Sequence, residues 1–288
     1  MTSPGSRLRA LLEGPLVVMP GAFDALSARL IERAGFPAVM AGGFAAAGTL
    51  LGEPDAGQMT LNDYTAHYSR MVDAVNVPVF VDADTGFGGV NNVYRTARSL
   101  SRAGIAGMFI EDQTTPKRCG YIAGKSLIST GEMVAKIRAA LDAREDDSFV
   151  ICARTDAWSA IDPDEAIERA CRYREAGADM TFVQGADELA DLTRVCATVP
   201  GPQLANLSHA SPRAKPTIAQ IAATGAAAVM YPSATLFAAA GAIARALDAL
   251  KRDGSFAGAE AGFVTAATYN EIVDLNAFLD REARADAR

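Results

Sequence analysis

Three acidic residues end two short apolar runs in the first half of the chain. Asp82 and Asp84 close the run "PVFVDAD", and Glu111 closes a later one, "GMFIE". On a strand, residues two positions apart point to the same side, and converging carboxylates repel one another unless protons or a cation intervene. Oxygen ligands with no cluster of His or Cys favour Mg2+, or alternatively Mn2+, over zinc. The three acids therefore predict a divalent metal site; helix capping or pairing with Arg154 is the alternative.

A cysteine lies beside two cations shortly afterwards, in "PKRCGY". Lys117 and Arg118 should lower the pKa of the Cys119 thiol, and a lowered pKa makes a thiol more reactive than one in a core. Cys119 could then act as a nucleophile or as an acid or base. The alternative is a small buried apolar residue, which suits the other three cysteines of the chain better than one in a polar loop next to Gly120.

The surroundings of these residues could bind an anion. Lys117 and Arg118 either form a solvated charge pair or bind a carboxylate substrate. Arg154 follows the apolar run "FVICA" and needs an anion there, which is either a metal-site acid or the substrate. Gly42 and Gly43 would let backbone N–H groups approach a ligand closely.

Histidine chemistry is disfavoured. His67 and His209 are the only histidines, they are far apart in the sequence, and no nucleophile-elbow motif accompanies them. A Ser-His-Asp triad therefore remains a minor alternative.

Eight short apolar runs must position these residues. They alternate with amphipathic stretches, and Gly follows the helical pattern in "RAGF", "RAGI" and "EAGAD", as expected at a helix C-cap. This alternation predicts an α/β fold, a (β/α)8 TIM barrel that forms a single domain over 1–288, with a C-terminal helical extension over 262–288. The runs cover 16–19, 37–42, 78–84, 107–112, 149–155, 180–184, 203–207 and 227–232.

The functional side chains of such a barrel lie at the C-terminal ends of its strands. A metal, a cationic pair and a thiol at that end suit chemistry on a small, multiply anionic molecule. The metal would hold a 2-oxo or 2-hydroxy carboxylate, and the thiol would protonate the carbanion released when a neighbouring C–C bond breaks. The polar residues at the strand ends are Asp82, Asp84, Glu111, Asp112, Arg154, Asp156, Gln184 and Asn206.

The composition is that of an acidic globular protein. Half of the 288 residues are hydrophobic, and 27 basic against 34 acidic residues give a net charge of −7, which disfavours binding to nucleic acid. No run approaches the ~18 apolar residues of a membrane span. The four cysteines lack CxxC or zinc-type spacing. We therefore expect a cytoplasmic protein with no membrane or nucleic-acid partner.

The chain resembles the isocitrate lyase / phosphoenolpyruvate mutase superfamily, and within it the short branch of methylisocitrate lyase, 2,3-dimethylmalate lyase and carboxyphosphonoenolpyruvate mutase-like proteins. The resemblance runs from "PGAFDALSARLIERAGFPAV" to "YPSATLFAAAGAIARAL" and includes "VDADTGFGG", "PKRCG" and "ARTDA". It implies a (β/α)8 barrel, Mg2+, a mobile loop over the site, and a homotetramer with a C-terminal helix swapped between subunits.

The resemblance also implies roles for individual residues. Asp82, Asp84 and Glu111 match the metal-site acids, which act mostly through water. Asp55 matches an acid of the gating region, and Arg154 matches the arginine that contacts the oxo-acid oxygen. Cys119 matches the thiol that marks the C–C lyases and oxaloacetate-type hydrolases, which argues against phosphonate chemistry. The implied catalytic residues are Cys119, Lys117, Arg118, Asp55 and Tyr121, and the implied substrate-binding residues are Gly42, Gly43, Asp82, Gly120, Arg154, Gln184 and Asn206.

Four positions depart from the pattern of the superfamily. Tyr121 stands in place of a His, Ala41 in place of a Ser, and Gln184 and His209 each in place of a Glu. A phenol keeps a hydrogen-bond donor but does not titrate near neutrality. The metal half of the site is unchanged and the half that reads the substrate is altered, so we expect a substrate other than methylisocitrate.

The leading expectation is a Mg2+-dependent C–C lyase that acts on a small anionic carboxylate. It would cleave a 2-hydroxy di- or tricarboxylate, such as a substituted malate, to pyruvate or glyoxylate plus a carboxylate. The alternatives are an oxaloacetate-type hydrolase or decarboxylase, a carboxyphosphonoenolpyruvate mutase-like phosphonate enzyme, and a catalytically silent barrel with a binding or structural role.

Overall fold

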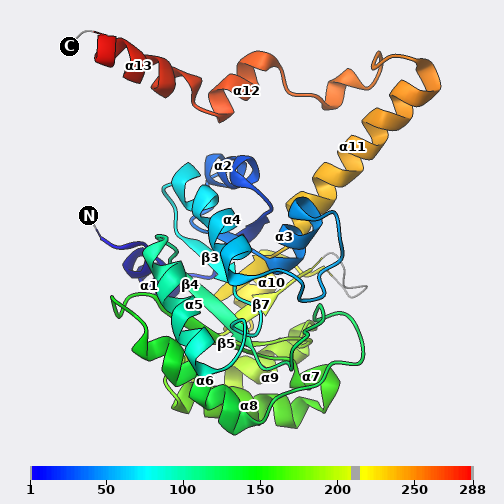
Figure 1. The fold of residues 1–288 in the computed structure, drawn as a ribbon. Coiled ribbons are helices and arrows are strands. Elements are labelled where there is room, and N and C mark those ends of the chain that lie inside the picture. The colour runs from blue at the N-terminus through cyan, green and yellow to red at the C-terminus, as the bar shows by residue number, and fades with distance from the viewer. Residues whose placement is uncertain (1, 209–214, 287–288) are drawn as a thin grey trace.

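Eight parallel strands form the centre of the protein in a computed structural model that describes residues 2–208 and 215–286 (Figure 1). They pair in the order β6-β5-β4-β3-β2-β1-β8-β7, and a single bridge between Thr181 and Gln203 joins the two ends of this sheet. The sheet is thus a nearly closed barrel, and the predicted (β/α)8 fold is confirmed. The strands are β1 (Val17–Ala22), β2 (Val39–Ala41), β3 (Val79–Asp82), β4 (Gly107–Glu111), β5 (Val150–Thr155), β6 (Met180–Val183), β7 (Leu204–Asn206) and β8 (Ala228–Tyr231).

Helices surround the barrel, and their ends follow local sequence signals. Ser129 accepts a hydrogen bond from the backbone N–H of Glu132, whose carboxylate bonds back to Ser129, so α6 begins with a capping box. Gly35, Gly104 and Gly177 take positive φ after α2, α5 and α8, as predicted. The helices are α1 (Pro4–Leu12), α2 (Ala25–Arg33), α3 (Gly43–Leu50), α4 (Leu61–Ala74), α5 (Val90–Arg102), α6 (Thr130–Asp142), α7 (Ala157–Ala160), α8 (Pro163–Glu175), α9 (Leu189–Thr198), α10 (Ile218–Ala222), α11 (Ala234–Asp253), η1 (Glu260–Gly262), α12 (Ala266–Ile272) and α13 (Leu275–Asp286).

The core has two layers, because successive side chains of a strand point to opposite faces. On β4, Met108 and Ile110 pack outward against the helices, while Phe109 packs inward against Phe80 and Phe182. Leu8 and its neighbours on α1 belong to the inner layer as well. The barrel interior is therefore filled, and a ligand can enter only above this layer.

The C-terminal segment lies outside the barrel. Figure 1 shows α11 projecting away from the strands, and the chain after it crossing above α2 as α12 and α13. Arg33 of α2 donates a hydrogen bond to the backbone carbonyl of Glu271 in α12 (3.2 Å). Within the described residues, no helix is both long and apolar enough to cross a membrane.

Candidate functional site

The inward-facing side chains change from apolar to polar at the C-terminal end of the barrel. On five neighbouring strands, or one residue past their ends, a buried polar residue follows the last apolar inward residue by two positions. Arg154 illustrates the step, because its guanidinium lies over the rings of Phe109 and Phe182, 5.8 and 5.2 Å from their centroids. The five pairs are Phe80 and Asp82, Phe109 and Glu111, Cys152 and Arg154, Phe182 and Gln184, and Leu204 and Asn206.

A small cavity of about 60 Å3 lies above this polar layer. It brings together most of the residues that the sequence indicated. The loop after β4 contributes four of the five positions from 117 to 121 to its wall, all except Arg118. The lining residues are Met40, Gly42, Phe44, Asp55, Asp82, Phe109, Lys117, Cys119, Gly120, Tyr121, Arg154, Gln184, Asn206, Ser208, Met230, Pro232 and Ser233.

Lys117 lies among the acids of the site. Its Nζ is 2.7 Å from Asp55 and 2.7 Å from Asp84, and its side chain is only 4% exposed. The alternative of a solvated charge pair is therefore wrong for Lys117. The surrounding carboxylates raise its pKa well above the ordinary value despite its burial, so it remains a cation.

Asp82 and Asp84 converge, although not for the expected reason. β3 ends at Asp82, and Asp84 has a positive φ of 46°, so the two do not share a strand. Both approach Gly43 at the start of α3, whose backbone N–H donates to Asp82 Oδ2 (3.1 Å). A Cβ at Gly43 would lie 2.4 Å from the Tyr64 hydroxyl and 3.3 Å from Asp84 Oδ1. Only glycine fits there without movement of these neighbours.

Arg154 bridges two acids. Its Nη1 is 3.0 Å from Glu111 Oε2, and its Nε donates to Asp156 Oδ2 (2.9 Å). The sequence left open that the acids pair with Arg154 in place of a metal, and Glu111 does form this ion pair. Asp156 is also paired with Lys125, at 3.0 Å.

The acids that face this region fit a hydrated divalent cation. Asp84 Oδ1 and both Glu111 oxygens are buried and accept no hydrogen bond, although cations lie near them. Burial raises the pKa of Glu111 well above its ordinary value, as expected for a carboxylate that lacks sufficient compensating charge. Hard oxygen donors suit Mg2+. In the described part of the chain, no three His, Cys, Asp or Glu side chains are grouped closely enough to hold an ion themselves.

Cys119 reaches the cavity, but its predicted pKa shift is wrong. Burial raises the pKa of its thiol, and the attraction of Arg154 and Lys117 does not overcome this. Lys117 is engaged by Asp55 and Asp84, and the exposed Arg118 donates instead to the backbone carbonyl of Ala123 (3.1 Å). The two sequence neighbours thus do not bring the pKa of the thiol below its ordinary value, and Cys119 keeps its proton near neutral pH.

The loop from 112 to 126 lies across the mouth of the barrel. Gln113 and Arg118 exchange side-chain and backbone hydrogen bonds of 2.9 and 3.0 Å. A Cβ at Gly120 would lie 2.5 Å from Arg154 Nη2 and 2.8 Å from Gln184 Cδ. Close packing of the Gly120 backbone therefore places Cys119 and Tyr121 over the cavity.

Among the remaining candidate residues, one lines the cavity, two lie away from it, and one lies outside the described residues. Gly42 lines it, whereas Ala41 packs outward in the layer between strands and helices, so the substitution of the usual Ser does not alter the lining. His67 is buried in α4, and burial lowers its pKa. His209 lies outside the described residues.

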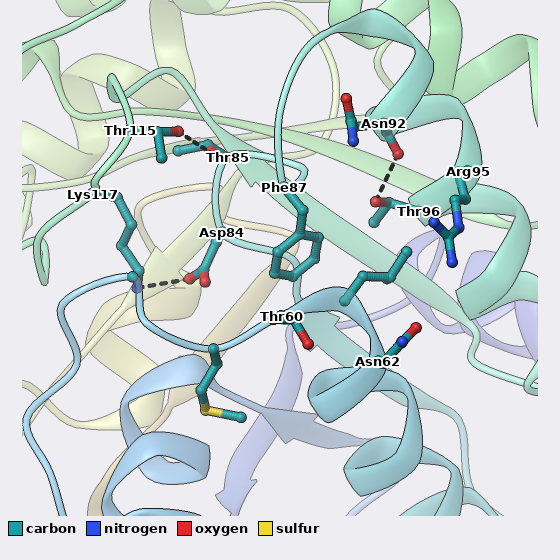
Figure 2. A pocket seen from close by; sticks show the side chains of 13 residues that line it. Thr60, Asn62, Asp84, Thr85, Phe87, Asn92, Arg95, Thr96, Thr115 and Lys117 are labelled. Carbon is teal, nitrogen blue, oxygen red and sulfur yellow. Dashed lines mark hydrogen bonds and ion pairs between the residues drawn. The ribbon is translucent and has the colours of Figure 1, made fainter.

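A second cavity, of about 340 Å3, borders the same lysine (Figure 2). Lys117 and Asp84 line it together with Thr85 and Thr115, whose hydroxyls are 3.3 Å apart. Figure 2 shows Lys117 reaching from the loop toward Asp84, with Arg95 on the facing helix α5. Cys119 and Arg154 do not line this second cavity.

Sequence reasoning missed Lys125 and the supporting role of Asp112. Asp112 is fully buried and accepts hydrogen bonds from Thr155, Tyr173 and the backbone N–H of Asp156. It therefore positions Asp156, whose carboxylate in turn accepts from Arg154. The acid beside Glu111 in "IED" was a signal for Asp112. The signal for Lys125 was weaker, since it is only a single lysine in "GKSLIS".

The fold and the site define a (β/α)8-barrel protein with a polar cavity at the carboxyl ends of its strands, where barrel enzymes have their active sites. The phosphoenolpyruvate phosphomutase family model matches residues 8–251. The chain therefore belongs to this family, within the PEP mutase/isocitrate lyase superfamily.

Named relatives of the chain include carbon–carbon lyases. The chain is 40% identical over 271 residues to 2,3-dimethylmalate lyase of Eubacterium barkeri, covering 94% of each chain, and 39% identical over 288 residues to 2-methylisocitrate lyase of Escherichia coli, covering 99% and 96%. A structure of oxaloacetate acetylhydrolase with 3,3-difluorooxalacetate superposes with a TM-score of 0.92 at 31% identity, covering 99% and 97%. A structure of phosphonopyruvate hydrolase with oxalate and Mg2+ superposes with a TM-score of 0.87 at 29% identity, covering 98% of this chain and 99% of that one.

Proposed function

We propose that the protein is a Mg2+-dependent carbon–carbon lyase that cleaves the C2–C3 bond of a 2-hydroxy acid such as a substituted malate. The products are pyruvate or glyoxylate and a second fragment protonated at C3. The observation that carries this proposal is that Cys119, Arg154 and Asp82 line one cavity. Burial there raises the pKa of the Cys119 thiol. The relatives named 2,3-dimethylmalate lyase and 2-methylisocitrate lyase support it.

The chain supplies a charged end for the oxo-acid half of the substrate. Arg154 is held in place by Glu111 and Asp156, so its remaining N–H groups donate to the oxygen on C2 without a change of rotamer. Asp82, Asp84 and Glu111 would hold Mg2+ through water. When bound, the metal stabilises negative charge on the C2 oxygen.

Cys119 acts at the other fragment. The C2 hydroxyl loses its proton to a base, the C2–C3 bond breaks, and the electron pair moves to C3. Cys119 donates its proton to C3, and the proton taken by the base returns to the thiolate. A thiol whose pKa is raised by burial is suited to this role, because an acid must be protonated when the carbanion forms.

A coupled assay tests the proposal. Purified protein with Mg2+ is incubated with a panel of substituted malates and methylisocitrate, and oxo-acid release is followed through lactate dehydrogenase. We expect release that EDTA abolishes. Cys119→Ser should lower it by about 10²–10⁴-fold, whereas the control Cys171→Ser, a thiol outside the cavity, should not. Absence of Mg2+-dependent oxo-acid release from every compound would contradict the proposal.

Hydrolysis of an oxaloacetate-like compound is the second candidate, favoured by the likeness to oxaloacetate acetylhydrolase. The same site would hold the 2-oxo acid at Arg154. Water would add to the C2 carbonyl, a base would take a proton from the hydrate, the C2–C3 bond would break, and C3 would take the proton of Cys119, which gives oxalate and acetate. Release of acetate and oxalate from oxaloacetate, in the absence of oxo-acid release from any 2-hydroxy acid, would favour this candidate. Release of CO2 would indicate a decarboxylase.

We also propose a homotetramer in which C-terminal helices pack on neighbouring subunits. Two apolar stripes support it. On α11, Ile243, Leu247 and Leu250 are exposed at helical spacing, and on α13, Phe278 and Leu279 are 53% and 51% exposed. A second copy of the chain would cover them.

A further inference from the structure

The turn that follows β3, residues 84–88, borders the second cavity and has an unusual backbone (Figure 2). Asp84, Gly86, Phe87 and Gly88 all have positive φ, at 46°, 82°, 60° and 141°. Glycine adopts such angles freely and Asp tolerates the left-handed region, whereas a bulky residue such as Phe87 does so only where its surroundings compensate for the strain. Because Asp84 is one of the acids proposed for Mg2+, the contacts that hold this turn bear directly on the metal site.

Three successive backbone carbonyls of the turn accept hydrogen bonds from three different elements of the barrel. A turn that is held from three sides cannot relax toward more ordinary backbone angles, which accounts for the persistence of the strain. The Asp84 carbonyl accepts from the Glu111 N–H in β4 (2.9 Å), the Thr85 carbonyl from Lys136 Nζ in α6 (2.9 Å), and the Gly86 carbonyl from Thr96 Oγ1 in α5 (3.2 Å).

Lys136 is the charged donor among these three. It is only 8% exposed, and it lines neither of the two cavities that border Lys117. Glu132, one turn earlier on α6, is engaged by Ser129 in the capping box. Among the described residues no acid forms an ion pair with Lys136, and burial lowers its pKa. The fold thus bears the cost of burying this cation and directs it at a backbone carbonyl of the turn.

The turn also orients the second acid of β3. The Asp84 N–H donates to Asp82 Oδ1 (2.9 Å), and the Gly43 N–H donates to Asp82 Oδ2 (3.1 Å). Each carboxylate oxygen of Asp82 is therefore fixed by a backbone N–H, one of which belongs to the turn. A shift of the turn would move the Asp84 carboxylate and release one oxygen of Asp82. Lys136 thus acts on two of the three proposed metal-site acids through the backbone.

We infer that Lys136 is a positioning residue for the metal site: by holding the Thr85 carbonyl from the outer helix α6, it keeps Asp82 and Asp84 in the arrangement that binds hydrated Mg2+. The inference rests on the Mg2+ site of the proposed function and adds to it a residue that lines neither cavity. Residues that orient metal ligands through hydrogen bonds typically change metal affinity by about 10–100-fold when they are replaced.

Charge and position predict opposite effects for the loss of Lys136. The Lys136 cation acts electrostatically on Glu111, so it also repels Mg2+ at the same acids, and its removal would tighten Mg2+ binding if charge alone mattered. Loss of the hydrogen bond to Thr85 would instead weaken Mg2+ binding. A lysine that only stabilised the fold would change the melting temperature and leave the Mg2+ affinity unchanged. The sign of the change in Kd therefore identifies the role.

Lys136→Met tests the inference, because it replaces the amine with an apolar side chain of similar length. Mg2+ is titrated calorimetrically into the full-length protein at pH 8, well above the pKa of about 6 of Asp84. We expect a Kd about 10-fold higher than in wild type. The matched control is Arg138→Met, which removes an exposed cation from the same helix and should leave Kd within about 2-fold. An unchanged or lower Kd for Lys136→Met would overturn the inference.

Thr96→Val gives a second measurement that leaves every charge in place. It removes the hydroxyl that holds the Gly86 carbonyl, so Kd should rise in the same direction but only about 3-fold, since a neutral hydrogen bond contributes less than a charged one. An unchanged Kd would show that the turn does not set the Mg2+ affinity. Amide hydrogen exchange over 84–88 should accelerate in both variants. If wild type binds no Mg2+, the metal-site proposal fails, while exchange in Lys136→Met as slow as in wild type would separately contradict the role of Lys136.

Discussion

Cys119 illustrates how burial decides the chemistry of a single residue. Because burial raises the pKa of its thiol, we expect the thiol to remain protonated through pH 8.5, the ordinary thiol pKa. An acid with a raised pKa is active below that pKa and loses activity as the pH rises through it. Lyase activity should therefore stay level from pH 7 to 8.5 and fall only at higher pH. A pH profile of kcat/KM measures this, and a decline between pH 7 and 8 in wild type would contradict the role of Cys119 as the acid.

Asp84 gives a second pH dependence, at the metal. Burial, opposed by Lys117 and reinforced by Asp82, raises the pKa of Asp84 to about 6. A carboxylate attracts Mg2+ most strongly when ionised, so Mg2+ binding should be strongest well above pH 6 and weaken as the pH falls through 6, by up to about 10-fold per unit for a single proton. Calorimetric titration of Mg2+ from pH 5 to 8 measures it. In Asp84→Asn, affinity should be low, with this dependence reduced; an unchanged slope would assign it to another group.

The sequence predicted residues on strands better than residues in loops. Asp82, Glu111 and Arg154 could be placed because alternation along a strand fixes which side chains face inward. The surroundings of Cys119 could not, since a loop has no such period. Adjacency in "KRC" indicated two cations beside the thiol, whereas the folded loop engages Lys117 with acids and turns Arg118 outward.

At the scale of elements, Lys125 ties the loop from 112 to 126 to the residue after β5, in addition to the contacts of Lys117 with Asp55 and Asp84. Lys125 Nζ donates to the backbone carbonyl of Gly120 (2.5 Å) and to Asp156 Oδ1 (3.0 Å), and its side chain is 3% exposed. Asp156 also holds Arg154. Lys125 thus links closure of the loop to the position of the arginine.

Lys125→Met should remove the bonds to Gly120 and Asp156 while the side chain keeps a similar volume. We expect kcat/KM to fall by about 10²-fold, because Cys119 and Arg154 would no longer be held in one geometry, and amide hydrogen exchange in 118–124 to accelerate. The exposed Lys251→Met serves as the control. Unchanged exchange in the loop of Lys125→Met would show that other contacts keep it closed.

The strands and several helix ends were predictable for local reasons, while α1 was not. Gly35, Gly104 and Gly177 marked three C-caps because glycine accepts positive φ. α1 is short and has only a weak pattern of apolar residues. It is stabilised by tertiary packing, because Leu8 belongs to the inner layer of the barrel. A segment stabilised chiefly by distant contacts leaves little trace in its own periodicity.

At the scale of the whole molecule, one barrel combines a buried charged site with an apolar arm. The acids of the site are partly balanced by Lys117, Lys125 and Arg154 within the barrel, whereas the exposed apolar side chains of α11 and α13 lack such compensation in a single chain. The cavity residues Tyr121, Gln184 and Asn206 lie at the carboxyl ends of the strands and in the loop after β4. The proposed assembly and the proposed substrate site therefore use different parts of the molecule and can be altered separately.

The arm provides the test of assembly. Leu275, Phe278 and Leu279 lie at i, i+3 and i+4 on α13, so they form one face that a neighbouring subunit would cover. Phe278→Asp together with Leu279→Asp should shift the protein from a tetramer to a smaller species in analytical ultracentrifugation, because burial of two charges would oppose association. Ile161→Asp is the matched control, since Ile161 is also 53% exposed but lies on the barrel after α7. Circular dichroism should be unchanged in both variants, and a double variant that sediments as wild type would show that α13 does not form the interface.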